Sequence, residues 1–180
     1  MGATTRNPSN RDYLQSTKFK FNMARLPGVT YFCQTVNLPG LSLTEVIRPT
    51  PFIDLYMPGE KLIYDSLNLT FIINEDLSDW EQMHDWIRAM TFPREFEEYA
   101  NLGKLSAASQ IRVGSKTPPQ YTDGSVTIFT NKNNPQIRVN FKDLFPTTLG
   151  GIQFNSMDSA ENILTCDASF KFSYYNIEKV

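Results

Sequence analysis

Cysteine and histidine are scarce in this chain of 180 residues, which limits the chemistry that it can carry. The two cysteines, Cys33 and Cys166, lack the CxxC spacing of a metal or redox motif, and both lie in strand-like runs. They are therefore expected to be small core residues in a reducing environment, with a disulfide or a reactive thiol as the alternatives. His84 has no second ligand at metal-binding spacing, so neither a metal site nor a cysteine–histidine nucleophile is predicted.

Long apolar runs, phosphate-binding loops and an excess of basic charge are also missing. No apolar run approaches the ~20 residues that cross a bilayer, and the polar segment 1–17 lacks the apolar stretch of a signal peptide, so membrane insertion is not expected. A net charge of −2 without a basic patch argues against tight binding of nucleic acid. Gly150 and Gly151 lack the lysine and the glycine spacing of a phosphate loop.

Adjacent carboxylates raise the question of catalysis. Glu75 and Asp76 look at first like a glycosidase or metal-binding pair. Negative charge at the start of a helix explains them more simply, because the helix dipole is positive there. The sequence therefore predicts no enzyme and no cofactor.

Aromatic residues are abundant, with 13 Phe and 8 Tyr, and they favour β structure and large buried or interfacial surfaces. Clean two-residue alternation predicts a strand at 18–23, and strand-like composition predicts another at 29–37, joined to the first as a hairpin across the turn at Leu26-Pro27-Gly28. A second hairpin is predicted from 126–129 and 137–141, and one closing strand from 164–174.

The stretch 62–90 reads as a strand that leads directly into the only convincing helix of the chain. Alternation through Ile73 ends at Asn74, and Ser78 with Glu81 has the spacing of a capping box. The residues expected to pack this helix against the body lie at three- and four-residue spacing: Trp80, Met83 and Ile87, continued by Met90.

An apolar but proline-rich stretch, 41–58, follows the turn at Pro39-Gly40. Its prolines exclude a central strand or a helix interior, so a long extended arm or splayed hairpin is expected. One interpretation is a loop folded back on its own core; the preferred one is an arm whose apolar residues are covered by another subunit. The contact residues predicted for that arm are Leu43, Val46, Ile47, Pro49, Phe52, Ile53, Leu55 and Tyr56.

These patterns predict a mainly β fold: an antiparallel β-barrel or β-sandwich of six or more strands with one flanking α-helix and a long extended arm. We expect a flexible amino-terminal arm at 1–17 and a single β-barrel domain at 18–180. Residues 92–122, punctuated by proline and glycine, are expected to form an irregular excursion with some local structure.

The order of four stretches resembles the tail tube proteins of contractile-tailed bacteriophages, which share a fold with the tube protein of type VI secretion systems. The stretches are the strand end at 36–40 before the long arm, the strand–helix unit from Tyr64 through Trp86, the segment 144–150 and the aromatic strand end at 170–175. Together they span roughly residues 18–176, and segments 1–17 and 92–122 fit the family pattern only loosely.

The resemblance implies a structural subunit of the virion tail, assembled in the host cytoplasm into stacked hexameric rings around a lumen through which DNA passes unbound. Sheath and baseplate proteins would be its other partners. Acidic side chains would repel DNA from the lumen wall, and Asp54, Asp65 and Asp167 are candidates for that role. The alternatives are a tube-like baseplate or tube-initiator protein and, in another class, a small β-barrel binding module or enzyme.

Overall fold

The computed structural model describes residues 12–91, 120–157 and 162–180. Most of the predicted arm at 1–17 and of the excursion at 92–122 lies outside these residues. The described part contains two helices, α1 (Pro27–Phe32) and α2 (Ser78–Thr91). Its strands are β1 (Phe19–Met23), β2 (Cys33–Val36), β3 (Leu41–Pro49), β4 (Asp54–Tyr64), β5 (Leu67–Ile72), β6 (Thr122–Phe129), β7 (Pro135–Leu149), β8 (Thr165–Lys171) and β9 (Tyr174–Lys179).

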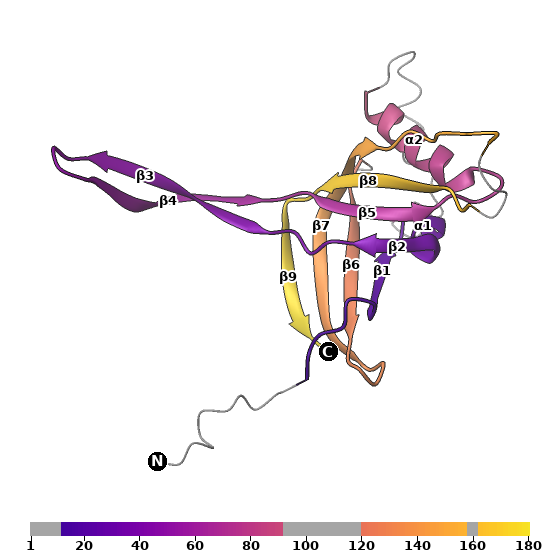
Figure 1. Cartoon of the computed structure of the whole chain (residues 1–180), viewed down its shortest axis with the longest axis horizontal. Coiled ribbons are helices and arrows are strands. Elements are labelled where there is room, and N and C mark those ends of the chain that lie inside the picture. Colours follow the sequence, from indigo (N-terminus) through magenta and orange to yellow (C-terminus); the bar gives the residue numbers. More distant parts are fainter. Residues whose placement is uncertain (1–11, 92–119, 158–161) are drawn as a thin grey trace, which may run out of the picture.

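The long strand β7 belongs to two antiparallel sheet regions that cross at a steep angle (Figure 1). Its first part pairs with β6 on one edge and β9 on the other, and β1 extends this region beyond β6. Its last part pairs with β8, which continues through β5 to β2. The predicted mainly β barrel or sandwich is therefore confirmed, and so is the hairpin of β6 and β7.

The two sheet regions differ in direction because β7 bends at Asp143 and the segment between β8 and β9 bends beside it. Asp143 has a φ of 56°, in the left-handed region, and it lies between the part of β7 that pairs with β9 and the part that pairs with β8. Opposite it, the backbone N–H of Ser173 donates to the carbonyl oxygen of Lys142 at 3.0 Å. The closing strand predicted at 164–174 is confirmed as β8, but its predicted end is wrong, because the chain bends after Lys171 and continues as β9.

The predicted hairpin of 18–23 with 29–37 is also wrong. Pro27 lies in the first turn of α1, where its fixed φ suits a helix, and this helix occupies residues 29–32 of the expected strand, which begins only at Cys33 as β2. Strand β1 pairs with β6 and β2 pairs with β5, so the two predicted partners lie in different sheet regions. Val29 is buried, and this tertiary contact outweighs the strand propensity of a short β-branched and aromatic run.

The core fills the space between the two sheet regions and α2. Each strand places alternate side chains in it, as the burial of Leu67, Leu69 and Phe71 on β5 illustrates. The largest fully buried side chains are Trp86, Phe21, Phe71, Phe141, Phe170, Met23, Leu67, Leu69, Met83, Leu144 and Val29.

Helix α2 is the predicted flanking helix, but its start and its buried face differ from the prediction. Leu77, with a φ of 58°, precedes the helix and its carbonyl oxygen accepts from the N–H of Glu81 at 3.0 Å. Ser78 is therefore already helical, and its hydroxyl contacts Asn74 and Asp76 instead of completing a capping box.

The largest fully buried side chain of α2 is Trp86, which the predicted packing stripe left out. Met83 is fully buried, whereas Trp80 and Ile87 are only partly buried against the core. The Trp86 indole N–H donates to the carbonyl oxygen of Gln120 at 3.2 Å, and the guanidinium of Arg25 lies 4.5 Å from its ring centroid. Burial lowers the pKa of Arg25 to about 10.

Candidate functional site

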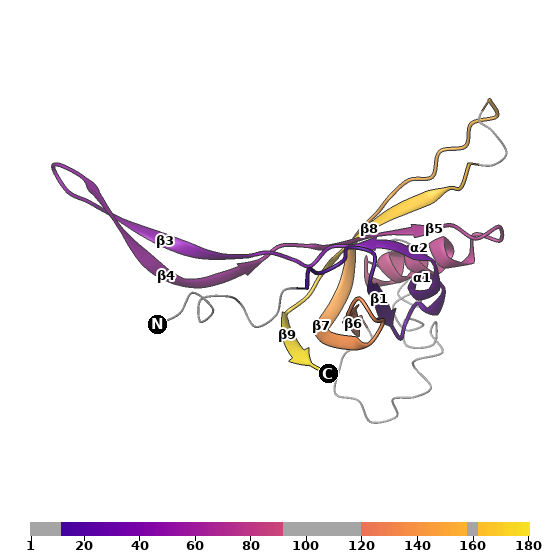
Figure 2. The ribbon, with the colours of Figure 1, turned by 60° about the horizontal axis from the view of Figure 1, so that its bottom comes forward.

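Strands β3 and β4 form a two-stranded arm that projects far from the body of the subunit (Figures 1 and 2). The arm pairs Leu41 with Tyr64 at its root and Pro49 with Asp54 near its tip. Both strands are edge strands, so Pro58 is tolerated within β4. The apolar stretch is therefore a continuous hairpin that does not fold back on the core of its own chain.

Large apolar side chains cover the arm and face solvent. Phe52 at the tip is 97% exposed, and Tyr56 on β4 is 66% exposed. Every predicted contact residue (Leu43, Val46, Ile47, Pro49, Phe52, Ile53, Leu55 and Tyr56) lies on this arm and is exposed. The structure adds Leu41, Met57, Leu62 and Ile63 to the exposed apolar residues of the arm.

The sequence pattern predicts that Leu62 and Ile63 belong to the strand that precedes the helix, whereas the structure places them in β4. The polar pair Asp65-Ser66, which separates β4 from β5, is the sequence feature that could have assigned Leu62 and Ile63 to the arm. Pro58 concealed the continuity of β4, because proline usually interrupts a strand.

Both faces of the arm carry apolar side chains. Val46 is directly opposite Met57 on one face, and Ile47 is directly opposite Tyr56 on the other. A solvent-exposed antiparallel hairpin would normally have at least one polar face. An arm that is apolar on two faces is suited to insertion between two surfaces.

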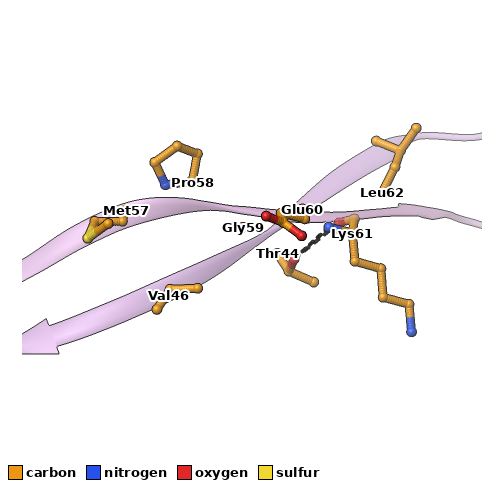
Figure 3. Close-up of a pocket in the computed structure, with 8 residues that line it drawn as sticks. All are labelled: Thr44, Val46, Met57, Pro58, Gly59, Glu60, Lys61 and Leu62. Carbon is orange, nitrogen blue, oxygen red and sulfur yellow. Dashed lines mark hydrogen bonds between the residues drawn. The ribbon is translucent and has the colours of Figure 1, made fainter.

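An irregular pairing twists the arm about halfway along its length (Figure 3). The hydroxyl of Thr44 accepts from the backbone N–H of Lys61 and donates to its carbonyl oxygen, both at 3.2 Å. Gly59 lies so close to this point that a Cβ there would be 2.5 Å from the Thr44 carbonyl oxygen. A residue without a side chain is therefore needed for the close approach of the two strands.

The root of the arm is fixed to the bend of the body by aromatic packing. The ring of Tyr64 lies 5.4 Å from those of both Phe172 and Tyr175, measured between centroids. The hydroxyl of Tyr175 donates to the carbonyl oxygen of Pro39 at 3.3 Å. These contacts hold the direction in which the arm leaves the body.

The three acidic residues proposed for a lumen lie on separate elements. Asp54 begins β4 near the tip of the arm, and Asp65 follows β4 at the root, where its N–H donates to the carbonyl oxygen of Gly40 at 3.1 Å. Asp167 lies on β8 and accepts from the Thr70 hydroxyl at 2.7 Å. The structure does not bring the three carboxylates together, and their role stays a prediction.

The remaining reactive side chains form no site in the described residues. His84 stacks on Trp80 at 5.3 Å and lies 3.3 Å from its neighbour Asp85. Both cysteines are free thiols; burial raises the pKa of Cys33 to about 11 and also raises that of Cys166, which disfavours the reactive thiolate.

Within the described ranges no cluster of three His, Cys, Asp or Glu side chains is placed to bind a metal ion. No described helix is long and apolar enough to span a bilayer.

Comparison with known proteins agrees with an assembly role for this fold. The tail tube terminator protein of Enterobacteria phage T4 is 24% identical over 156 residues, which cover 83% of this chain and 78% of that protein. The tube-terminating cap of the anti-feeding prophage has a similar structure, with a TM-score of 0.58 at 12% identity over 100% of both chains.

Two further structures, both from an extracellular contractile injection system, share the fold. One is its sheath/tube terminator assembly, with a TM-score of 0.56 at 13% identity over 94% of this chain and 99% of that chain. The other is its sheath–tube complex, with a TM-score of 0.54 at 13% identity over 100% of this chain and 99% of that chain. Residues 3–178 match the family described as phage tail tube protein, and the chain therefore belongs to that family.

Proposed function

We propose that this chain is a tail tube terminator: a ring-forming structural subunit that binds one end of the tail tube and stops its growth. The observation that carries the proposal is the similarity to the T4 tail tube terminator, which extends over most of both chains. The likeness to a tube-terminating cap and to a sheath/tube terminator assembly supports the same position at the tube end.

The β3–β4 arm is the part of the subunit that makes assembly contacts in this proposal. Its exposed apolar residues would be covered by a neighbouring copy on one face and by the adjacent tube ring on the other. The contacts of Tyr64 with Phe172 and Tyr175 at the root support this role, because they fix the direction of the arm before assembly.

We further infer a hexameric ring that surrounds a lumen for DNA, with tube and sheath proteins as its neighbours in the virion tail. The family membership supports the ring, and the similar sheath–tube and terminator assemblies support the neighbours. Residues 18–180 would form the single tube domain of each subunit, and the chain would act without catalysis.

Labelling of intact virions tests the position. Gold-labelled antibodies against this chain should bind at the head-proximal end of the tail, and cryo-electron microscopy should place one ring of the chain there. Label along the whole tail would overturn the terminator assignment, and label at the baseplate end would favour the tube-initiator alternative.

A subunit of the tube along its length is the second candidate function. The family match and the similar sheath–tube complex favour it, because the fold is common to tubes and their terminators. Negative-stain images of the purified chain separate the two functions. A terminator should form single rings, whereas a tube subunit should polymerise into long tubes at high concentration.

A further inference from the structure

The two apolar faces of the β3–β4 arm carry charges of opposite sign. From Glu45 to Pro49 the pairing with β4 is regular, so successive side chains point to alternate faces. The acidic face carries Glu45, Ile47, Pro49, Asp54, Tyr56 and Pro58. The basic face carries Val46, Arg48, Leu55 and Met57. Each face is therefore an apolar surface marked by charge of one sign.

These charges are not neutralised within the subunit. Arg48 lies opposite Leu55 and points away from Glu45 and Asp54, which belong to the other face. All three charged side chains are exposed, and none forms an ion pair within the described residues. The adjacent Glu60-Lys61, in the irregular stretch of the pairing, adds no net charge. Two arms cannot pack through the same face without bringing like charges together, which disfavours a two-fold contact between arms.

The end of the body that lies far from the arm is acidic and partly apolar. This distal end consists of residues 73–82, where α2 begins, and of the segments 150–157 and 162–167 between β7 and β8 (Figures 1 and 2). These ranges contain no Lys or Arg. Glu75 and Asp76 are exposed, and so are the apolar side chains of Phe154 and Ile163, at 77% and 66%.

Hydrogen bonds hold the apolar and acidic parts of the distal end together. The N–H of Ile73 donates to the carbonyl oxygen of Leu164 at 3.0 Å, next to the segment that carries Glu75 and Asp76. The indole N–H of Trp80 donates to the carbonyl oxygen of Gly150 at 3.2 Å, which fixes the start of the connection between β7 and β8 on α2. The distal end therefore presents apolar side chains beside carboxylates.

We propose that the basic face of the arm of one copy binds the distal end of the next copy. This contact rests on the proposed function, which requires copies of the chain to close into a ring. Arg48 would lie against Glu75 and Asp76, and the apolar side chains around Arg48 would cover Ile163. The two surfaces differ and lie at opposite ends of the subunit, so repetition of the contact by rotation closes a ring.

Charge also decides which face of the arm binds the neighbour. The acidic face would place Glu45 and Asp54 against a surface that has carboxylates and no cation, and like charges at an interface are strongly unfavourable. The acidic face is therefore left for the tube ring. It follows that the tube end should offer an apolar surface flanked by Lys or Arg.

Charge reversal tests the contact between copies. Arg48→Glu should raise the protein concentration at which half of the chains are in rings by about tenfold, and Glu75→Lys combined with Asp76→Lys should do the same. An equimolar mixture of the two variants should return that concentration close to the wild-type value, because each arm then meets a distal end of opposite charge. Native mass spectrometry should find equal numbers of the two variants in these rings.

Two controls separate the contact from folding and from tube binding. Arg48→Glu should not change the thermal midpoint of the monomer, and the double lysine variant should lower it by no more than about 4 °C, through lost charge at the start of α2. Glu45→Lys, on the acidic face, should leave free rings unchanged and weaken their binding to tube ends.

The outcomes distinguish the contact from the proposed function. If the wild-type chain forms rings and both charge reversals leave them intact, the contact is wrong while the terminator assignment stands. A mixture that assembles no better than either variant alone would also overturn the contact, as would loss of free rings in Glu45→Lys. Long tubes of the wild-type chain that both reversals prevent would keep the contact and overturn the terminator assignment. A wild-type chain that forms no ring, alone or with its tube, would overturn both.

Discussion

Gly28 on α1 lies directly against the carboxylate of Asp79 on α2: a Cβ at Gly28 would be only 1.7 Å from Oδ1 of Asp79. Asp79 is 4% exposed, and its other oxygen, Oδ2, has no hydrogen-bond partner among the described residues. The contact joins the two helices of the described part. It also explains why a helix residue carries no side chain at position 28.

The first prediction concerns this contact. Gly28→Ala should lower the free energy of unfolding by about 1–3 kcal/mol, because the added methyl group forces the Asp79 carboxylate out of its place. In an Asp79→Ala background the same glycine substitution should cost less than half as much. Urea unfolding of the four proteins measures the coupling, and equal costs in both backgrounds would contradict the contact.

The second prediction concerns pH. Burial raises the pKa of Asp79 above its usual 3.8, Asp76 also raises it, and a hydrogen bond with Asn74 opposes the shift. Above pH 3.8 the folded chain therefore keeps a proton that the unfolded chain releases, so stability falls as the pH rises and levels off above the folded-state pKa.

Asp79→Asn removes this dependence. The variant should gain stability relative to the wild type as the pH rises above 3.8, and the gain should level off above the folded-state pKa of Asp79. Urea unfolding at several pH values measures the difference. A difference that stays constant with pH would show that Asp79 does not titrate differently in the folded state.

The third prediction compares the two tryptophans of α2. Trp86 is 1% exposed, so Trp86→Ala should cost about 3–5 kcal/mol of unfolding free energy. Trp80→Ala should cost roughly half of that, because its ring is only partly buried and stacks on exposed His84. Thermal and urea unfolding check the order, and equal costs would show that the helix packs on another face.

The fourth prediction concerns the tip of the arm. Phe52→Asp should leave the thermal midpoint of the monomer within about 2 °C of the wild-type value, because the side chain is 97% exposed. It should block ring formation or attachment to the tube, since a charge would enter an apolar contact. Gln82→Asp, on the exposed side of α2, is the control. Unfolding of the Phe52→Asp monomer would mean that the tip belongs to a core.

The fifth prediction concerns the twist of the arm. Gly59→Val should separate β3 from β4 near Thr44, because the added side chain would collide with the Thr44 carbonyl oxygen. Assembly should weaken by about tenfold, whereas the unfolding free energy of the body should change by less than about 0.5 kcal/mol. Hydrogen exchange of the Lys61 amide reports the local opening, and unchanged exchange would contradict the prediction.

Parts of the fold could be predicted because local patterns agreed with the tertiary environment. Alternation identified β5, β6 and the first part of β7, where one face of each strand is buried. The same reasoning failed at residues 29–32, where Val29 packs from a short helix. It also missed Trp86, because several apolar residues of α2 shared helical spacing and only the position of the body decides which are buried.

The arm shows how far the site could be predicted. Three prolines among apolar residues indicated an extended segment outside the core, and that inference needed only the chemistry of proline and of apolar surface. The pairing of β3 with β4 and the twist at Gly59 could not be read from the chain, because register depends on contacts between residues far apart in sequence.

The sequence by itself determined that this protein is mainly β and carries an apolar arm. Composition and periodicity suffice for those conclusions, because they act through local propensity and burial. The tertiary structure alone decided the bend at Asp143, the positions of the outer edges at β1 and β9, and the direction of the arm. These features arise from long-range pairing and packing, and the proposed assembly rests on the last of them.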